Sequence, residues 1–311
     1  MRMIAIDLGS NTLRVTEMDC HTGEFGASFE KIVKTADGLA DRGSIHPDAV
    51  ERVISAIYEA KDEIDFSSGR VRAVTTEALR RAVNADAVLA EIREKTGVIF
   101  EIISGEEEAE LTLLAVEHRL DLLYRDLGSD RLDSFVLIDI GGGSTELIFC
   151  YPHKRVTRSF PIGIVTVAQQ YLTLEAIAEA IPIVMREMQI FTDEVYSREG
   201  IVDRLVATAG TPTTVAAMKL GQNYADYDPR QINGSQLSIR DLDRELEYLL
   251  SLPFAQRETI VGVGRSDLIA AGILIFKHLL SIVGMDQCVV IDDGLREGVA
   301  LQSCIESECW V

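Results

Sequence analysis

The feature that most constrains the fold is a strand-and-loop pattern that occurs twice, about half the chain apart. The apolar run Met3–Ile6 leads into Asp7–Thr12, and the apolar run Phe135–Ile138 leads into Asp139–Thr145. Each copy is a strand that ends in aspartate, turns through glycine and hydroxyl residues, and continues into another strand. The repeat predicts an internal duplication, and therefore two α/β domains that face each other across a cleft, each with one such loop.

Composition supports two hydrophobic cores and narrows the range of partners. The chain has 311 residues, of which 47% are hydrophobic, so it is too long for one typical domain. With 30 Lys and Arg against 50 Asp and Glu, its net charge is −20. Such acidity disfavours nucleic acid or an anionic membrane as a partner. If the substrate is a polyanion, local basic groups, backbone N–H groups and a metal ion must attract it.

The cysteines and the apolar segments predict a soluble, cytoplasmic protein. An odd number of cysteines at irregular intervals fits reduced thiols better than a disulfide framework: Cys20, Cys150, Cys288, Cys304 and Cys309. The N-terminus enters an apolar strand at once, which does not resemble a secretory signal. The longest apolar stretch, Leu268–Val283, contains Lys277 and His278 and is expected to be a buried helix rather than a membrane span.

Hydrophobic periodicity predicts an alternation of strands and helices. Strands are expected at Met3–Ile6, Leu13–Met18, Phe25–Val33, Val71–Thr75, Val98–Ile103, Phe135–Ile138, Glu146–Tyr151, Arg155–Phe160, Leu205–Thr208 and Cys288–Ile291. Helices are expected at Pro47–Ile64, Ala85–Glu94, Ser104–Tyr124, Val165–Tyr171, Leu174–Tyr196, Pro212–Met218, Ser238–Ser251, Leu268–Val283 and from Gly294 onward, with Pro182 splitting the fifth. A polar linker at Leu127–Ser134 predicts domains at 1–126 and 127–297, with a helix at about 298–311 returning to the first.

The glycine loops have the composition of anion-binding sites. Glycines let backbone N–H groups approach an anion, and the aspartate and hydroxyl groups beside them can hold a hydrated Mg²⁺. A simple tight hairpin explains Asp7–Thr12 equally well, but three glycines in Asp139–Thr145 exceed what a hairpin needs. The turn containing Gly210 and Thr211 leads from a strand to a helix start, which is either an anion site or an ordinary connection.

Charged residues near two helix starts are further candidates. Glu107 completes a capping box with Ser104, and acidic residues there also interact favourably with the helix dipole. Glu108 is not needed for capping and is a candidate general base, although composition and spacing alone favour the structural explanation. Arg80, beside Arg81 after a strand, is equally a phosphate-binding fork or a member of a surface salt bridge.

Together these motifs resemble the exopolyphosphatase / guanosine pentaphosphate phosphohydrolase family in its short, two-domain form. The matching segments occur in the family's order along essentially the whole chain: Ile6–Thr12, Ala73–Arg80, Ile103–Ala109, Ile138–Glu146, Ala209–Thr211, Gly264–Asp267 and Asp293–Gly298. The resemblance implies two RNase H-like domains, as in acetate kinase, sugar kinases, heat-shock chaperone ATPases and actin. The chain departs from the family at Glu110, where a basic residue is usual, and in a longer segment between Glu108 and Asp139. No histidine is followed by aspartate, so the helical domain of longer members is not expected.

The resemblance also implies roles for individual residues. Glu108 corresponds to the general base that activates water, while Asp139 and Glu146, with Asp7 from the opposite domain, correspond to ligands of Mg²⁺ or Mn²⁺. The positions that correspond to phosphate contacts are Ser10, Asn11, Arg80, Gly141, Gly142, Gly143, Ser144 and Thr145, with Gly210 and Thr211 as weaker candidates. The expected reaction is in-line attack of water on the terminal phosphorus of inorganic polyphosphate or guanosine pentaphosphate.

Two other functions are compatible with the same fold: an ATP-dependent kinase or ATPase, and a non-enzymatic phosphate-binding sensor. The clustered carboxylates argue against a pure sensor, since a binder of polyphosphate gains nothing from extra negative charge. A homodimer is the slightly favoured oligomeric state. Because both loops can grip one phosphate only if the cleft closes, hinges are expected near Leu127–Ser134 and Asp293–Gly298.

Overall fold

The computed structural model describes residues 1–127 and 134–307, and the chain divides into two compact units. Unit 1 comprises Met1–Ala115 and Gly294–Val311, and unit 2 comprises Val116–Asp293. The predicted linker at Leu127–Ser134 lies largely outside the described residues, as does Cys309. Helix α5 (Gly105–Leu127) begins in unit 1 and continues in unit 2.

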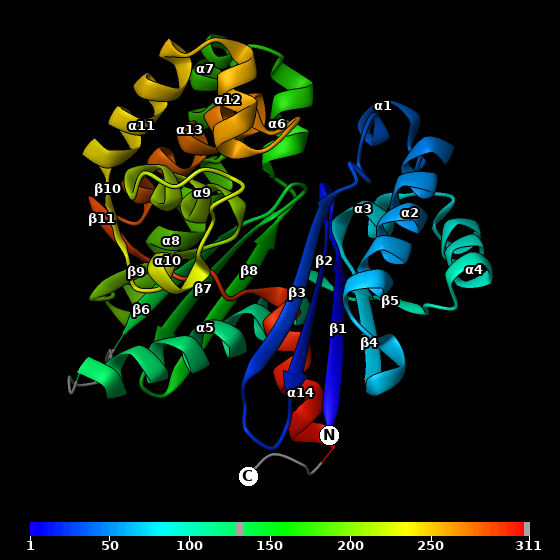
Figure 1. Cartoon of the computed structure of the whole chain (residues 1–311). Coiled ribbons are helices and arrows are strands. Elements are labelled where there is room, and N and C mark those ends of the chain that lie inside the picture. Colours follow the sequence, from blue (N-terminus) through cyan, green and yellow to red (C-terminus); the bar gives the residue numbers. More distant parts are fainter. Residues whose placement is uncertain (128–133, 308–311) are drawn as a thin grey trace. The chain divides into compact units, whose positions relative to one another are not determined.

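Unit 1 is built on a five-stranded sheet with the order β3-β2-β1-β4-β5 (Figure 1). Its strands are β1 (Arg2–Leu8), β2 (Thr12–Asp19), β3 (Phe25–Ile32), β4 (Arg70–Thr75) and β5 (Phe100–Ile102). The first three strands form an antiparallel meander, and β4 and β5 run parallel to β1. This order and these directions are those of an RNase H-like sheet.

Strand alternation distributes the apolar residues of β1 between two helical layers. Met3 and Ala5 pack against α5 and α14 (Leu295–Glu306), and α2 (Pro47–Glu63) contacts the sheet at β2 and β3. The helix α14 comes very close to α5 at Gly298. A Cβ at this position would lie only 1.9 Å from the carbonyl oxygen of Leu111. The remaining helices of unit 1 are α1 (Leu39–Arg42), η1 (Phe66–Ser68), α3 (Glu77–Arg81) and α4 (Ala85–Thr96).

Unit 2 repeats the same sheet with one added strand. The order is β10-β11-β9-β6-β7-β8, in which β6, β7 and β8 form the meander, and β9 and β11 run parallel to β6. The strands are β6 (Phe135–Ile140), β7 (Thr145–Tyr151), β8 (Lys154–Phe160), β9 (Arg204–Thr208), β10 (Gln236–Ser238) and β11 (Gln287–Val290). The predicted fold class, an α/β protein with two RNase H-like domains, is therefore confirmed.

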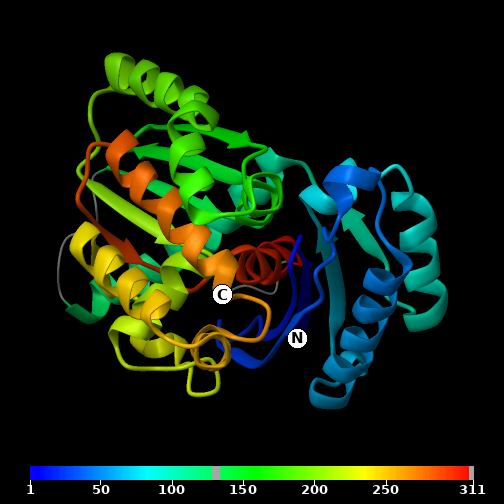
Figure 2. The ribbon, with the colours of Figure 1, turned by 90° about the horizontal axis from the view of Figure 1, so that it is seen from above.

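The helices of unit 2 pack around α13 (Ser266–Ile282), which runs through the middle of the unit (Figure 2). They are α6 (Ile164–Tyr171), α7 (Leu174–Val184), α8 (Arg186–Glu199), α9 (Gly210–Lys219), α10 (Pro229–Ile232), α11 (Ile239–Ser251) and α12 (Phe254–Val261). Pro182 lies near the end of α7, and a new helix starts at Arg186, so the predicted split is confirmed. No described helix alone is long and apolar enough to cross a membrane; only α12 and α13 together, bent by 69°, reach that length and composition.

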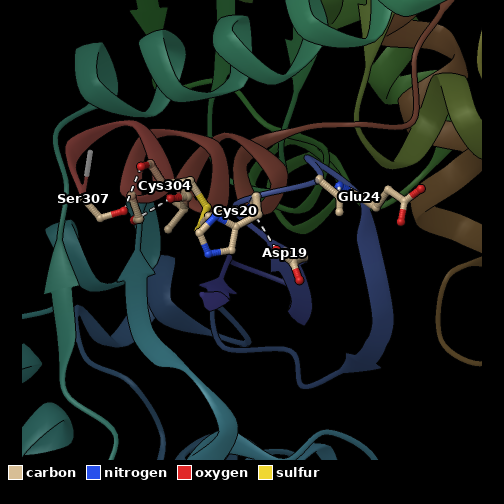
Figure 3. The surroundings of a disulfide bond; sticks show 9 residues. Asp19, Cys20, Glu24, Cys304 and Ser307 are labelled. Atoms are coloured by element: carbon tan, nitrogen blue, oxygen red, sulfur yellow. Dashed lines mark hydrogen bonds between the residues drawn. A yellow bond between two sulfur atoms is a disulfide. The ribbon is translucent and has the colours of Figure 1, made fainter. Parts of the chain in front are cut away.

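One prediction about the cysteines is wrong. Cys20, directly after β2, forms a disulfide with Cys304 on α14, although the two are 284 residues apart in the sequence. Figure 3 shows this bond, with the Ser307 hydroxyl donating to the carbonyl oxygen of Cys304 at the end of the helix. Cys150 and Cys288 are buried free thiols. Because α14 returns to the sheet of unit 1, tertiary structure brings together two cysteines that sequence spacing could not pair.

Candidate functional site

In unit 2, the β6–β7 hairpin places two carboxylates side by side. Asp139 on β6 lies opposite Glu146 on β7, and directly opposite residues of an antiparallel pair project from the same face. The row continues through the register partners Thr208 on β9 and Ser159 on β8. We call Thr208, Asp139, Glu146 and Ser159 the polar row. The Ser159 hydroxyl donates to Glu146 Oε1 over 2.7 Å.

Burial makes this pair of carboxylates unusual. Asp139 is 9% exposed and Glu146 is 1% exposed. Two neighbouring carboxylates removed from water repel each other unless a cation or a proton accompanies them. In the part of the chain that the structure describes, no three His, Cys, Asp or Glu side chains form a metal-binding group. Two carboxylates are the kind of oxygen donors that suit a hydrated Mg²⁺, which one or two carboxylates hold together with water and substrate phosphate.

The glycine loop between β6 and β7 is held in place by hydrogen bonds that its carbonyl oxygens accept. The N–H of Gly141 donates to the carbonyl oxygen of Ser144 over 2.9 Å, which closes the turn. The first N–H groups of α6, those of Ile164 and Val165, donate to the carbonyl oxygens of Gly141 and Gly142 over 3.0 and 2.8 Å. Within the described residues, the N–H groups of Gly142 and Gly143 make no hydrogen bond. Such N–H groups are candidate contacts for an anion; Gly142 is partly exposed and Gly143 is buried.

The hydroxyl residues of this loop are both buried. Ser144 is 3% exposed, and Thr145 is completely buried. The Thr145 hydroxyl donates to the carbonyl oxygen of Ile162 over 2.6 Å, so its hydrogen already has a partner that shapes the loop.

Gly163 is a residue of this site that the sequence reasoning missed. A Cβ at this position would lie 2.4 Å from the backbone atoms of Gly142 and Gly143. Only glycine therefore allows the segment before α6 to pack against the loop. The sequence signal that could have identified Gly163 is its position between a strand and the start of a helix.

A second candidate anion-binding element of unit 2 is the start of α9. Ala209 has a φ of 71°, and the helix begins at Gly210. A guanidinium lies beside this start: Arg265 Nη2 donates to Thr214 Oγ1 over 3.1 Å and lies 3.1 Å from where a Cβ of Gly210 would be. The cation and the helix N-terminus both favour an anion. Arg265 lies in the family-matching segment Gly264–Asp267, but the sequence analysis assigned no role to this residue.

Thr211 points elsewhere. It is completely buried, and a Cβ on Gly272 of α13 would lie 2.1 Å from its Oγ1. Its hydroxyl makes no hydrogen bond among the described residues. The side chain thus contributes to the packing of α9 on α13, and only its backbone remains a candidate anion contact.

In unit 1, the loop after β1 has the same turn as the loop in unit 2. The N–H of Gly9 donates to the carbonyl oxygen of Thr12 over 3.0 Å, as Gly141 does to Ser144. The residue opposite Asp7 is Arg14, whereas the residue opposite Asp139 is a glutamate. The duplicated hairpins therefore differ in charge, and the paired carboxylates belong to unit 2.

The predicted contacts Ser10 and Asn11 lie in this loop. The carbonyl oxygen of Ser10 accepts from Ala36 N over 2.8 Å, and that of Asn11 accepts from the N–H groups of Val33 and Lys34, each over 2.9 Å. Lys34 is exposed and has a φ of 50°, a left-handed conformation that is rare for a residue other than glycine. This lysine beside the loop was also missed, because sequence patterns give no sign of its backbone conformation.

Arg80 and Glu108 are brought together in unit 1. Arg80 Nη1 donates to Glu108 Oε2 over 2.9 Å and to the carbonyl oxygen of Ile103 over 2.8 Å. The two side chains are 18% and 12% exposed. Burial alone would lower the pKa of Arg80, but the carboxylates of Glu108 and Glu77 outweigh it and raise the pKa. The guanidinium is therefore charged at any physiological pH.

Glu107, by contrast, has a structural environment. Its N–H makes the predicted capping contact by donating to Ser104 Oγ over 3.1 Å. This contact is the backbone half of the predicted capping box, and it confirms that Glu107, and not Glu108, belongs to the helix cap. The carboxylate of Glu107 lies 3.4 Å from Arg72 Nη2. The side chain of Glu108 points instead to Arg80.

Comparison with known proteins shows which family this chain resembles along its length. The model of the Ppx/GppA phosphatase family matches residues 26–306. Exopolyphosphatase 2 of Mycobacterium tuberculosis is 28% identical, over 96% of this chain and 98% of that protein. The crystal structure of the Aquifex aeolicus member of the Ppx/GppA family is 29% identical with a TM-score of 0.75, covering 99% of this chain and 98% of that one. An exopolyphosphatase structure from Cytophaga hutchinsonii, 21% identical, covers all of both chains with a TM-score of 0.84 and supports the fold.

Proposed function

Because this chain belongs to the Ppx/GppA phosphatase family, we propose that it is a phosphohydrolase that releases the terminal phosphate of inorganic polyphosphate. The observation that carries the proposal is the buried pair of Asp139 and Glu146 at the base of a loop in which the N–H groups of Gly142 and Gly143 make no hydrogen bond among the described residues. Similarity to proteins named exopolyphosphatases supports polyphosphate as the substrate. Guanosine pentaphosphate is the alternative substrate, since it also ends in a phosphate on a polyanion.

Unit 2 supplies most of the groups that would bind the terminal phosphate. Asp139 and Glu146 would hold Mg²⁺ or Mn²⁺, with Asp7 of unit 1 as a further proposed ligand. Such an ion, when bound, neutralises phosphate oxygens and makes a bound water more acidic. The N–H groups of Gly142 and Gly143 would donate hydrogen bonds to the negatively charged equatorial oxygens. Arg265, beside the start of α9, would add a local positive charge in a protein whose net charge is −20.

Glu108 is the proposed general base. It would accept a proton from water as the water oxygen bonds to the terminal phosphorus and the bond to the bridging oxygen breaks. The electron pair of that bond leaves with the shortened polyphosphate, and Arg80 would stabilise the negative charge on the transferred group. Ser10, Asn11, Gly141, Ser144, Thr145, Gly210 and Thr211 remain proposed substrate contacts.

Phosphate release from defined substrates tests this proposal. We expect the purified protein to release phosphate from inorganic polyphosphate, and Asp139→Asn to lose most of that activity. Asp203→Asn is a matched control, because Asp203 at the start of β9 bonds to the Ser134 hydroxyl, away from the polar row. Guanosine pentaphosphate and ATP are assayed in parallel. Tight binding of polyphosphate without release would indicate a sensor, and phosphate release from ATP alone would indicate an ATPase or kinase.

A cytoplasmic location and a homodimer belong to the same proposal. The disulfide between Cys20 and Cys304 removes the argument that all cysteines are reduced, so the location must be tested by fractionation. Light scattering during gel filtration tests the dimer.

A further inference from the structure

Helix α3 holds the guanidinium of Arg80 with a carboxylate from its own first turn. Arg80 Nε and Nη2 both donate to Glu77 Oε2, over 3.2 and 3.1 Å. Residues three apart on a helix are neighbours, so the contact is local. The two side chains are 14% and 18% exposed, which shields the pair from the solvent screening that weakens most surface salt bridges.

The other end of the guanidinium contacts a different part of unit 1. Nη1 donates to Glu108 on α5 and to the carbonyl oxygen of Ile103, which follows β5. Arg80 thus connects α3 with the start of α5, and each of its three nitrogens has a defined acceptor. A guanidinium is rigid and planar, so the carboxylate on the Nε side fixes the direction of Nη1.

Two carboxylates face the guanidinium of Arg80, and one of them, Glu77, also lies 3.9 Å from Arg81 Nε, so the positive charge of Arg80 is already neutralised where phosphate is proposed to bind. A phosphate can approach Arg80 favourably only if one of the carboxylates moves away. Glu108 is the one expected to move, because it accepts from one nitrogen of Arg80, whereas Glu77 accepts from two and belongs to the same helix. Moving away also suits a general base, since a carboxylate paired with arginine accepts a proton less readily.

We propose that Glu77 is a positioning residue, which keeps Arg80 in place while its Nη1 group exchanges Glu108 for a phosphate of the substrate. This inference rests on the proposed function. In the structure Arg80 holds the proposed base, and in the proposed exchange an arriving phosphate releases it. The role of Glu77 is to keep the guanidinium from following either partner.

Substitutions at Glu77 distinguish its positioning of Arg80 from the effect of its negative charge. We expect Glu77→Ala to lower kcat on polyphosphate by roughly tenfold to a hundredfold, because small displacements of a catalytic group have effects of that size. Glu77→Gln keeps an oxygen that can accept from Nε and Nη2, and is expected to retain most of the activity that Glu77→Ala loses. Equal activity of Glu77→Ala and the unmodified protein would overturn the inference. So would equal losses in both variants, which would mean that charge alone matters.

Glu91→Gln is the matched control, since Glu91 pairs with Lys95 over 2.9 Å on helix α4 of the same unit. Glu77→Ala removes the pairs with Arg80 and Arg81, which are less exposed at Glu77 than the Glu91 pair, so it is expected to lower thermal stability more than Glu91→Gln. Only Glu77→Ala should change kcat. If Glu77→Ala does not fold, Glu77→Asp replaces it, because the shorter side chain draws the carboxylate away from Arg80. The same loss of kcat is then expected, and unchanged kcat would contradict the inference.

Binding distinguishes a failure of this inference from a failure of the proposed function. Calorimetric titration with inorganic triphosphate is carried out in a Glu108→Gln background, where the proposed base is absent. Weaker binding after Glu77→Ala supports the inference even if the unmodified protein proves unable to hydrolyse polyphosphate. Unchanged binding, in a protein that does release phosphate, together with unchanged kcat, overturns the inference and leaves the function standing.

Discussion

Asp139 and Glu146 are register partners across the β6–β7 hairpin, and both are buried. Their mutual repulsion predicts that a divalent cation binds there, and that phosphate release requires Mg²⁺ or Mn²⁺. Asp139→Asn should raise the Mg²⁺ concentration for half-maximal activity by roughly tenfold or more, as losses around metal sites commonly do. The measurement is phosphate release against free Mg²⁺. Full activity in excess EDTA would remove the metal from the mechanism.

Replacement of Glu108 should affect turnover far more than substrate affinity. General-base catalysis typically contributes on the order of 10²–10⁴-fold, so Glu108→Gln should reduce kcat by that amount while KM changes little. Glu107→Gln is the control, because the adjacent carboxylate contacts Arg72 instead of Arg80. Steady-state kinetics on polyphosphate checks both variants. Near-normal turnover in Glu108→Gln, with a loss in Glu107→Gln, would show that the base is the other glutamate.

The close contact of Gly163 with the glycine loop predicts a defect in phosphate binding. A methyl group at this position would lie 2.4 Å from the backbone of Gly142 and Gly143, so Gly163→Ala must displace the loop. We expect KM for polyphosphate to rise by roughly tenfold, as for other small displacements in binding sites. Gly200→Ala is the control, because that glycine has a φ of 93° and open space around it. It should lower stability through backbone strain without changing KM.

The disulfide predicts that reducing agents lower the stability of unit 1. Loss of a bond that closes a long loop typically costs about 2–5 kcal/mol, and Cys304→Ser should therefore lower the melting temperature. Calorimetry with and without reductant measures the effect. Reductant should destabilise the unmodified protein and leave Cys304→Ser unchanged. Five reactive thiols in the denatured, unreduced protein would show that the bond does not form.

The sequence was sufficient to predict the two matching sheets. The repeated hairpins, at Asp7–Thr12 and Asp139–Thr145, lie at equivalent places in two strand orders that agree except for the added strand β10 of unit 2. The strand β10 was missed because three residues are too few to show a period of two. The disulfide was missed because cysteine spacing carries no information about which cysteines meet in space.

The candidate site was predictable where its residues are close in sequence. The proximity of Asp139 and Glu146 follows from a hairpin with a four-residue turn, which register alone determines. Gly163 and Arg265 reach their loops through the packing of α6 and α13, which local patterns do not reveal. In the sequence, Glu77 is only one residue of the matching segment Ala73–Arg80. Its proposed positioning role depends on the direction of the Arg80 side chain, which the sequence does not show.

The disulfide also makes the polypeptide a covalent ring with two short tails, because Cys20 lies near its beginning and Cys304 near its end. The whole of unit 2 belongs to the ring. A protease that cuts one peptide bond anywhere between the two cysteines would therefore open the ring without releasing a fragment. The nicked molecule would keep its full mass on a gel run without reductant and separate into two pieces once the disulfide is reduced.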